Sequence, residues 1–313
     1  MDNLVFDNYE IDAAAVNSLA KQGIDEFISE CEKNYQQHIE KIAKDIIKSG
    51  KERTLIFLAG PSSSGKTTTA HRIEDELVKD GYSVAVLSMD DFYLKREETP
   101  MRSDGTYNLE SLYALDVPLI EKCMTELLEA GETHIPIFDF KVKSTIGTQK
   151  VSLNGKGCVI MEGLNAINPA VCDIDGNVIK VYVSTATTFV MGEKEIMTPR
   201  HNRLIRRMVR DVKFRNTPPA ETIDMWPYVV EGEEIYIDPY KDDVDYQINT
   251  TMLYEPLLYK EYLTDLLDNN DNNESTEDEI KRLLKILEPF KEIEKIVSIP
   301  KNSIMTEFLG GTI

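Results

Sequence analysis

The residues most able to do chemistry are residues 60–67, which read GPSSSGKT and satisfy the spacing G-x-x-x-x-G-K-[ST]. The two glycines let the backbone bend so that its N–H groups point inward, where they bind phosphate oxygens. Lys66 adds a positive charge for the terminal phosphates, and the hydroxyl of Thr67 is placed to coordinate Mg²⁺. The spacing therefore predicts a loop that binds nucleotide phosphates. The predicted nucleotide-binding positions are Gly60, Pro61, Ser62, Ser63, Ser64, Gly65, Lys66, Thr67 and Thr68.

The segments around this loop are those that position such a site. The apolar run TLIFLAG, residues 54–60, predicts a strand because it is short and rich in aliphatic residues. Residues 66–79 predict a helix that stops at Asp80-Gly81, and SVAVLSM, residues 83–89, predicts a second strand. Strand, turn, helix and strand form a βαβ unit with two parallel strands, and so an α/β fold. The alternative is a Gly/Ser-rich turn that binds nothing.

Carboxylates follow two of the predicted strands. Asp90 and Asp91 lie after the second strand, where ligands gather in open α/β sheets. A carboxylate at this point could accept the proton of an attacking hydroxyl or help to hold Mg²⁺. The alternative is that the pair serves as a turn or a helix cap. Glu162 ends another apolar strand, VIMEG, and belongs either to the same metal shell or to a plain charged strand end.

Arginines are concentrated in RLIRRMVRDVKFR, residues 203–215, although the chain has a formal net charge of −20. At helical spacing four of them share a broad face, which suits phosphate charge that grows in a transition state. The alternative is a basic helix whose arginines pair with acidic neighbours. The four residues on that face are Arg203, Arg206, Arg207 and Arg210.

The rest of the chain continues the alternation of helices and strands. Residues 16–49 predict an amphipathic helical region that ends at Ser49-Gly50. The acidic segment 265–279 is typical of a solvated loop rather than an interaction tail, and residues 280–293 predict one more amphipathic helix. We expect a helical segment over residues 1–50 and a single domain over residues 51–313. Further strands are expected at 133–138, 157–163 and 178–184, and further helices near 109–130, 200–214 and 219–229.

Composition excludes several classes of function. With 35 Lys and Arg against 55 Asp and Glu, the chain is too acidic to grip nucleic-acid phosphates or an anionic membrane. Its apolar runs are strand-length, far short of the roughly 20 residues that span a bilayer. The acidic start MDNLVFDNYE lacks the features of a secretory signal, so we expect a cytoplasmic protein. Four widely spaced cysteines argue against a zinc site or disulfides and are expected to be buried: Cys31, Cys123, Cys158 and Cys172.

The motifs GPSSSGKTT, SMDDFY, EG and RLIRRMVRD, in this order, resemble the uridine kinase and phosphoribulokinase family of P-loop kinases. YNLESLYALDVPL, IPIFDFKVKS, MWPYVVEGEEIYIDP and the terminal NSIMTEFLGG resemble a bacterial uridine or nucleoside kinase branch, so the similarity extends from about Ile39 to the C-terminus. The resemblance implies a P-loop kinase fold. Such a fold has a parallel sheet of about five strands flanked by helices, and an Arg-rich lid that closes over the nucleotide.

The resemblance also implies roles for individual residues. Asp90 matches the catalytic base, and Thr67, Asp90 and Glu162 would surround Mg²⁺. Tyr93 and Glu110 would line the acceptor pocket. Lys66 and the lid arginines would neutralise the transferred phosphoryl group. The arginines that match the lid and face phosphates and substrate are Arg207, Arg210 and Arg215.

The departures from the family pattern fall in the acceptor pocket. Phe138 and Lys143 stand where uridine kinases place a Tyr and a His against the pyrimidine, which removes a hydrogen bond that reads the base. Met225 replaces a Gln near the ribose, and Thr217 replaces the last lid arginine. A site built to hydrogen-bond its substrate rejects analogues strongly, so these changes should alter which acceptor is selected.

The leading hypothesis is an ATP- and Mg²⁺-dependent kinase for the 5′-hydroxyl of a nucleoside such as uridine or cytidine. A kinase for another sugar, a polyol or a phosphorylated sugar is the alternative within the same class, and Lys143 could favour an anionic acceptor. An alternative of another class is a nucleotide-binding regulator without turnover. A carboxylate aimed at an acceptor hydroxyl favours the enzyme over the regulator. Family habit suggests a homo-oligomer.

Overall fold

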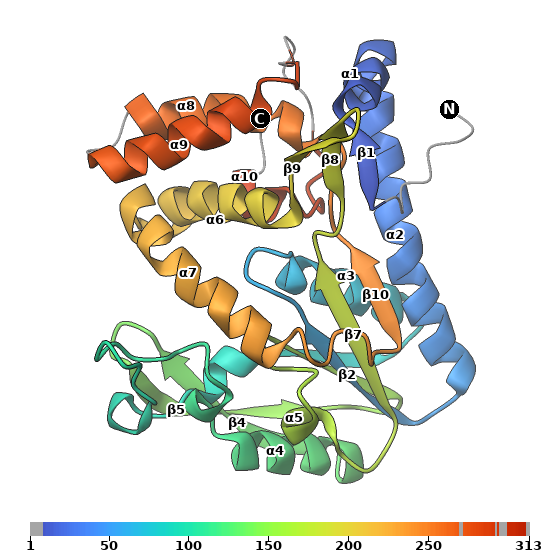
Figure 1. Cartoon of the computed structure of the whole chain (residues 1–313). Coiled ribbons are helices and arrows are strands. Elements are labelled where there is room, and N and C mark those ends of the chain that lie inside the picture. The colour runs from blue at the N-terminus through green and yellow to red at the C-terminus, as the bar shows by residue number, and fades with distance from the viewer. Residues whose placement is uncertain (1–8, 269–271, 292, 294–298, 311–313) are drawn as a thin grey trace.

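A five-stranded parallel sheet forms the centre of the computed structural model, which describes residues 9–268, 272–291, 293 and 299–310 (Figure 1). Its strand order is β10-β7-β2-β6-β3, and every neighbouring pair is parallel. The predicted parallel α/β fold is confirmed. The strands are β2 (Arg53–Ala59), β3 (Ser83–Ser88), β6 (Gly157–Gly163), β7 (Val178–Ser184) and β10 (Tyr246–Asn249).

Both faces of this sheet are covered, so its inner strands read as continuous apolar runs. In β2, Ile56 and Leu58 pack with α2 (Ile24–Ser49) and α3 (Lys66–Lys79), while Leu55 and Phe57 pack toward α4 (Val117–Glu129) on the opposite face. Each of these fully buried side chains contributes roughly 1.5–3 kcal/mol. Figure 1 shows α2 along one side of the sheet and α4 on the other.

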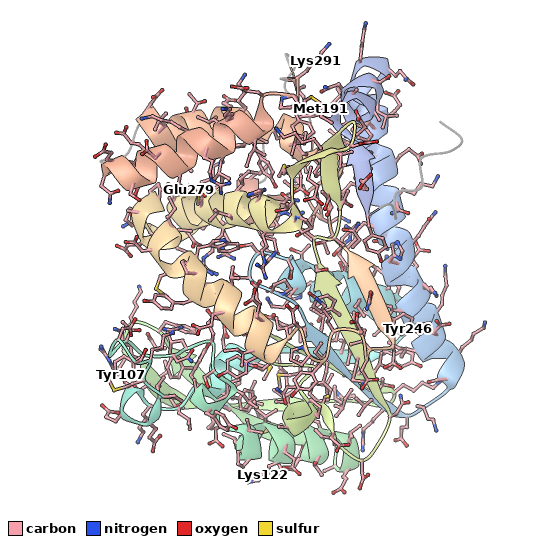
Figure 2. The ribbon with its side chains drawn as sticks, in the orientation of Figure 1. Tyr107, Lys122, Met191, Tyr246, Glu279 and Lys291 are labelled. Carbon is pink, nitrogen blue, oxygen red and sulfur yellow. The ribbon has the colours of Figure 1, made fainter. Side chains whose placement is uncertain are left out.

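The N-terminal helical region is two helices instead of one. α1 (Ala13–Gln22) ends at Gly23, and α2 continues to Ser49, where Gly50 in a left-handed conformation ends it as predicted. Side chains on one face of α2 are buried against α3, and the hydroxyl of Tyr246, labelled in Figure 2, donates to Asp45 of α2 at 2.9 Å. The domain boundary at residue 50 stays a prediction.

Smaller sheets flank the central one. β4 (Glu132–Asp139) was predicted, but it lies outside the central sheet and pairs antiparallel with β5 (Ser144–Ser152). A three-stranded sheet joins β1 (Glu10–Asp12) to β8 (Thr188–Met191) and β9 (Lys194–Met197). β8, β9 and the central strand β10 were missed because each has only four residues, and β5 was missed because its side chains are mostly exposed.

The helices after the phosphate loop differ from the expectations mainly at their ends. The helix expected near 109–130 begins only at Val117, because Asp116 caps it by accepting from the Leu119 N–H at 3.0 Å. α6 (Pro199–Arg215) matches the expectation, and α7 (Pro219–Tyr236) continues past residue 229. The remaining short elements are η1 (Met89–Phe92), η2 (Arg96–Glu98), η3 (Leu112–Ala114), α5 (Pro169–Cys172), η4 (Glu255–Leu257) and α10 (Thr306–Leu309).

The prediction of a solvated loop over 265–279 was wrong for most of that segment. α8 (Tyr259–Asp268) and α9 (Glu274–Leu287) occupy both ends of it and lie side by side (Figure 1), while residues 269–271 are outside the described part. Asn273 caps α9, and acidic residues in its first turn favour the helix. Acidity alone therefore did not distinguish a loop from the exposed face of a helix.

All four cysteines are buried, as predicted, and each carries a free thiol. Within the described residues, none of the helices has the length and apolar content that crossing a bilayer requires.

Candidate active site

The phosphate loop joins β2 to α3, as the sequence predicts. α3 spans residues 66–79, and Gly65 precedes it in a left-handed conformation with a φ of +83°. Gly60 has no room for a side chain, because an added Cβ would collide with the carbonyl oxygen of Val183 in the neighbouring strand β7. The loop therefore needs glycine at both positions.

The loop carries polar atoms that have no partner among the described residues. The hydroxyls of Ser63 and Ser64 are buried and make no hydrogen bond within that part of the chain. Lys66 donates from its ammonium only weakly to the Pro61 carbonyl, at 3.2 Å, in the loop itself. Buried groups of this kind are normally satisfied. Phosphate oxygens would accept from all of them, so the residues fit a nucleotide.

The outer side of the loop is held by three donors. The carbonyls of Ser62, Ser63 and Ser64 accept, in turn, from Arg203 Nη1 at 3.1 Å, Arg206 Nη1 at 3.3 Å and Thr250 Oγ1 at 2.7 Å. Because a peptide's N–H and C=O point in opposite directions, fixing the carbonyls outward supports the inward-facing cradle.

Arg203 and Arg206 are thus structural, which corrects their placement on a phosphate-facing arginine face. Arg203 pairs with Glu233, and the fully buried Arg206 pairs with Glu255 at 2.7 Å. For these two arginines the alternative prediction, that the arginines of this helix pair with acidic residues, is confirmed.

The predicted lid arginines converge on one carboxylate. Asp211 is buried, and its oxygens lie 2.8 Å from Arg210 Nη2, 3.3 Å from Arg207 Nε and 3.6 Å from Arg215 Nε. Arg207 also donates to the Ser62 hydroxyl in the phosphate loop at 2.9 Å. Asp211, which sequence reasoning missed although it follows Arg210 directly, therefore orients the three arginines.

The sheet brings Asp90 and Glu162 together. Ser88 of β3 pairs with Glu162 of β6, and Asp90 follows Ser88 by two residues. Burial raises the pKa of Glu162, and Lys66 opposes this rise. Removal from bulk water likewise raises the pKa of Asp90, although the side chain keeps access to solvent, and Lys66 and Arg215 oppose that rise. A cation placed among these groups would be stabilised by both carboxylates.

The two neighbouring aspartates have different surroundings. Ser88, rather than either aspartate, caps η1 by accepting from the Asp90 N–H at 3.3 Å. Asp91 accepts from the backbone N–H of Phe138 at 3.4 Å and so ties η1 to β4. Of the two, Asp90 is the carboxylate whose pKa Lys66 lowers.

The donor set suits Mg²⁺ held partly by phosphate. The Thr67 hydroxyl is exposed and lies 3.3 Å from Glu162 Oε1. No group of three or more His, Cys, Asp or Glu residues is arranged to hold a metal in the described part of the chain. Mg²⁺ typically uses one or two protein carboxylates and completes its octahedron with phosphates and water. The residues Thr67, Asp90 and Glu162 fit that mode.

An apolar cavity of about 140 Å³ lies beside η1. Its walls include the rings of Tyr93, Phe138 and Phe140, whose centroids are 5.2–5.9 Å apart. Burial raises the pKa of Tyr93 and its hydroxyl donates to the Leu109 carbonyl at 3.0 Å. The other lining residues are Leu94, Arg96, Thr99, Tyr107, Leu109 and Lys143, of which Tyr107 is labelled in Figure 2.

Glu110 follows Leu109, which lines this cavity, and packs closely against α7. Burial raises its pKa, Arg207 opposes the rise, and Lys66 and Asp90 lie close enough to influence it. Gly232 of α7 allows the close approach, since a Cβ there would lie 2.6 Å from Glu110 Cβ. Glu110 thus lies near Lys66, but it is not among the residues that line the aromatic cavity, and its role in the acceptor pocket stays a prediction.

Asn165 is a further polar residue that sequence reasoning missed. It is buried, its amide donates to the Glu110 carbonyl at 3.5 Å, and no described residue donates to its Oδ1. Its position three residues after Glu162 was the available signal. Met225, by contrast, is exposed on α7, and Thr217 follows the end of α6.

Comparison with known proteins places this site in a family. The sequence profile of the phosphoribulokinase / uridine kinase family matches residues 55–253. This chain belongs to that family. A uridine kinase from Staphylococcus haemolyticus is 27% identical over 194 residues, which cover 61% of this chain and 85% of that protein. A uridine kinase from Bacillus cereus is 27% identical over 193 residues, covering 61% of this chain and 82% of that one.

A solved structure supports the fold. A Silicibacter protein provisionally named as a kinase of a fructose transport system aligns with a TM-score of 0.50 and 15% identity, over 67% of this chain and 98% of its own. Family membership makes the protein a phosphotransferase acting on a hydroxyl group, with ATP use as a family property. The match leaves out residues 1–54 and 254–313.

Proposed function

We propose that this kinase transfers the γ-phosphoryl group of ATP to the 5′-hydroxyl of a nucleoside, with uridine or cytidine as the preferred acceptor and Mg²⁺ as the metal. The observation that carries the proposal is the position of Asp90, which lies close enough to Lys66 and Glu162 for the charges of these groups to interact. Asp90 is also close enough to Tyr93, a wall of the aromatic cavity, to raise the pKa of that hydroxyl. A hydroxyl of a molecule seated in this cavity would lie next to a carboxylate.

The residues divide the reaction among them. Asp90 accepts the proton of the acceptor hydroxyl as the oxygen attacks the γ-phosphorus, and the bond from that phosphorus to the β–γ bridging oxygen breaks to leave ADP. Lys66, Arg207 and Arg210 balance the negative charge of the transferred group. Thr67, Asp90 and Glu162 would hold Mg²⁺, which supplies further neutralisation of the phosphates when bound.

The acceptor pocket would make three kinds of contact with a nucleoside. Tyr93 and Phe138 offer faces on which a base can stack, a contact worth about 1–3 kcal/mol per base in nucleic-acid complexes. Glu110, with Asn165 beside it, can accept from sugar hydroxyls. Arg207 would contact the acceptor from the lid. Because Phe138 lacks a hydroxyl, stacking rather than hydrogen bonding would dominate recognition of the base.

A second acceptor class is favoured by one observation. Arg96 and Lys143 both line the aromatic cavity, and their positive charges would attract an anionic acceptor such as a phosphorylated sugar. The two classes differ in what fills the cavity, a neutral base in the first and an anionic group in the second.

The test is ADP release with ATP and Mg²⁺ across nucleosides, pentoses, polyols and phosphorylated sugars, with the product identified by mass. We expect a nucleoside 5′-monophosphate, and loss of turnover in Asp90→Asn. Asp91→Asn is the matched control, because its amide oxygen can still accept from Phe138 and the residue does not face Lys66. Turnover only with a pentose, a polyol or a phosphorylated sugar would contradict the nucleoside as acceptor and keep the kinase mechanism. Tight ATP binding without any acceptor would contradict the enzyme and favour a nucleotide-binding regulator.

A further inference from the structure

The end of the chain is packed against the phosphate loop. Residues 303–309, here called the C-terminal segment, include α10, which contacts α6 (Figure 1). The side chain of Ile304 lies against Gly65, where an added Cβ would overlap it. The Thr68 hydroxyl donates to Glu307 Oε2 at 2.7 Å. Two positions of the predicted nucleotide site, Gly65 and Thr68, therefore touch this segment.

The segment is anchored firmly. Phe308 is fully buried with the guanidinium of Arg206 4.8 Å from its ring, and Lys213 donates to the Leu309 carbonyl at 2.8 Å. Ser303 is also fully buried, and its hydroxyl bonds to the carboxylate of Glu32 in α2. Contacts from α6, through Arg206 and Lys213, and from α2, through Glu32, thus fix the position of Glu307 relative to the phosphate loop.

The segment lies outside the residues that the family profile matches. The family match ends at residue 253, which is 54 residues before Glu307. Any role of Glu307 is therefore additional to the machinery inferred from the family.

The charge of Glu307 needs an explanation. Among the described residues the Glu307 carboxylate forms no ion pair, and the group that donates to it is the Thr68 hydroxyl. A carboxylate beside a site for three phosphates weakens their binding by like-charge repulsion, unless it accepts hydrogen bonds from another part of the same ligand.

The parts of a nucleotide that lie next to its phosphates indicate which part that is. The backbone N–H groups of the loop cradle the α and β phosphates, and Lys66 reaches the β and γ phosphates. Glu307, bonded to Thr68 just after this loop, lies beside the phosphate site. Beyond the α-phosphate a nucleotide continues with its ribose, whose hydroxyls are hydrogen-bond donors that carboxylates accept in other nucleotide sites.

We propose that Glu307 is a specificity-determining residue of the nucleotide site that accepts hydrogen bonds from the ribose hydroxyls of the phosphate donor. The C-terminal segment then forms one wall of that site. The proposal rests on the proposed use of ATP, but it concerns the donor and not the acceptor.

The experiment measures equilibrium binding of ATP and 2′,3′-dideoxy-ATP, each with Mg²⁺, to the full chain without an acceptor. In the wild type we expect ATP to bind about 10–100-fold more tightly, the range for hydrogen bonds to a charged group. In Glu307→Ala this ratio should fall to near one. Glu307→Gln keeps an oxygen that can accept from Thr68 and should give an intermediate ratio with unchanged thermal stability.

A control and the opposing outcomes make the test decisive. Thr306→Ala changes the neighbouring residue, whose hydroxyl bonds within the segment to the Ser303 carbonyl, and it should leave the ratio unchanged. Equal ratios in the wild type and both Glu307 variants would overturn the proposal and leave Glu307 as an anchor for Thr68. Failure of the wild type to bind ATP at all would overturn the proposed function together with this inference. The expected ratios without any acceptor turnover would uphold the inference and contradict the proposed function alone.

Discussion

The ion pair between Arg206 and Glu255 should be the part of the molecule most sensitive to loss of one charge. Both side chains are fully buried, and Arg206 Nε lies 2.7 Å from Glu255 Oε2. Glu255 also accepts from Asn202 at 2.7 Å and from the hydroxyl of Tyr259. Glu255→Gln removes the negative charge and turns an amide NH₂ toward these donors. The guanidinium would then be buried without a counter-charge.

The expected cost follows from this geometry. Removing one partner of a buried pair destabilises a protein by about 3–5 kcal/mol, because the remaining charge cannot regain its water. In a chain of this size that corresponds to a fall in the melting temperature of about 5–10 °C. Because Arg206 also holds the Ser63 carbonyl, ATP affinity should fall in the same variant.

The assay is thermal and urea unfolding of the wild type and two variants. The matched control is Glu277→Gln, which removes the partner of Lys281 from an exposed pair at 2.8 Å on α9. Exposed pairs contribute little, so the control should unfold close to the wild type. If Glu255→Gln unfolded at the same temperature as Glu277→Gln, the argument that buried charges hold the phosphate loop would be refuted.

Three further perturbations test the site. Gly60→Ala should reduce ATP affinity and destabilise the fold by about 1–3 kcal/mol, because the added Cβ would collide with the Val183 carbonyl oxygen. Calorimetry would measure the affinity and thermal unfolding the stability, and an unchanged affinity would contradict the prediction. Glu162→Gln should abolish turnover yet raise the melting temperature of the nucleotide-free protein at pH 7. Burial raises the pKa of Glu162, so the stability that the protonated Glu162 provides is lost as pH rises through that pKa. The increase in melting temperature caused by Glu162→Gln should therefore become smaller on acidification. An increase that is larger at pH 4 than at pH 7 would show that the buried charge of Glu162 is not its cause. Asp211→Asn should lower kcat by about 10²-fold, because three arginines lose their common carboxylate; steady-state kinetics with a melting control would check this, and an unchanged kcat would contradict it.

Local patterns were the predictable part of the structure. Residues 66–79 form the helix expected of them, because the cradle before it and Asp80-Gly81 after it are encoded in neighbouring residues. The segment at 265–279 shows where such patterns are ambiguous. Acidic residues suit both a loop and the exposed side of a helix, and the burial of Ile280 and Leu283 against distant elements decided the outcome.

Long-range pairing was the part that the sequence could not supply. Arg203 and Arg206 carry the same charge and helical spacing as Arg207 and Arg210, and nothing local separates them. Their partners, Glu233 and Glu255, lie 30 and 49 residues away along the chain. The assignment of each arginine to structure or to phosphate therefore required the fold.

The same pairing explains why an acidic protein buries arginines beside a phosphate site. A loop that binds anions through its N–H groups must keep its carbonyls turned away from the anion. The buried side chains of Arg203 and Arg206 do this by donating to the carbonyls of Ser62 and Ser63. Glu233 and Glu255 neutralise Arg203 and Arg206, so these two donors support the carbonyls without binding the phosphates themselves. The net charge of −20 thus coexists with phosphate binding, because the loop places Lys66 and because Asp211 holds Arg207, Arg210 and Arg215 beside it.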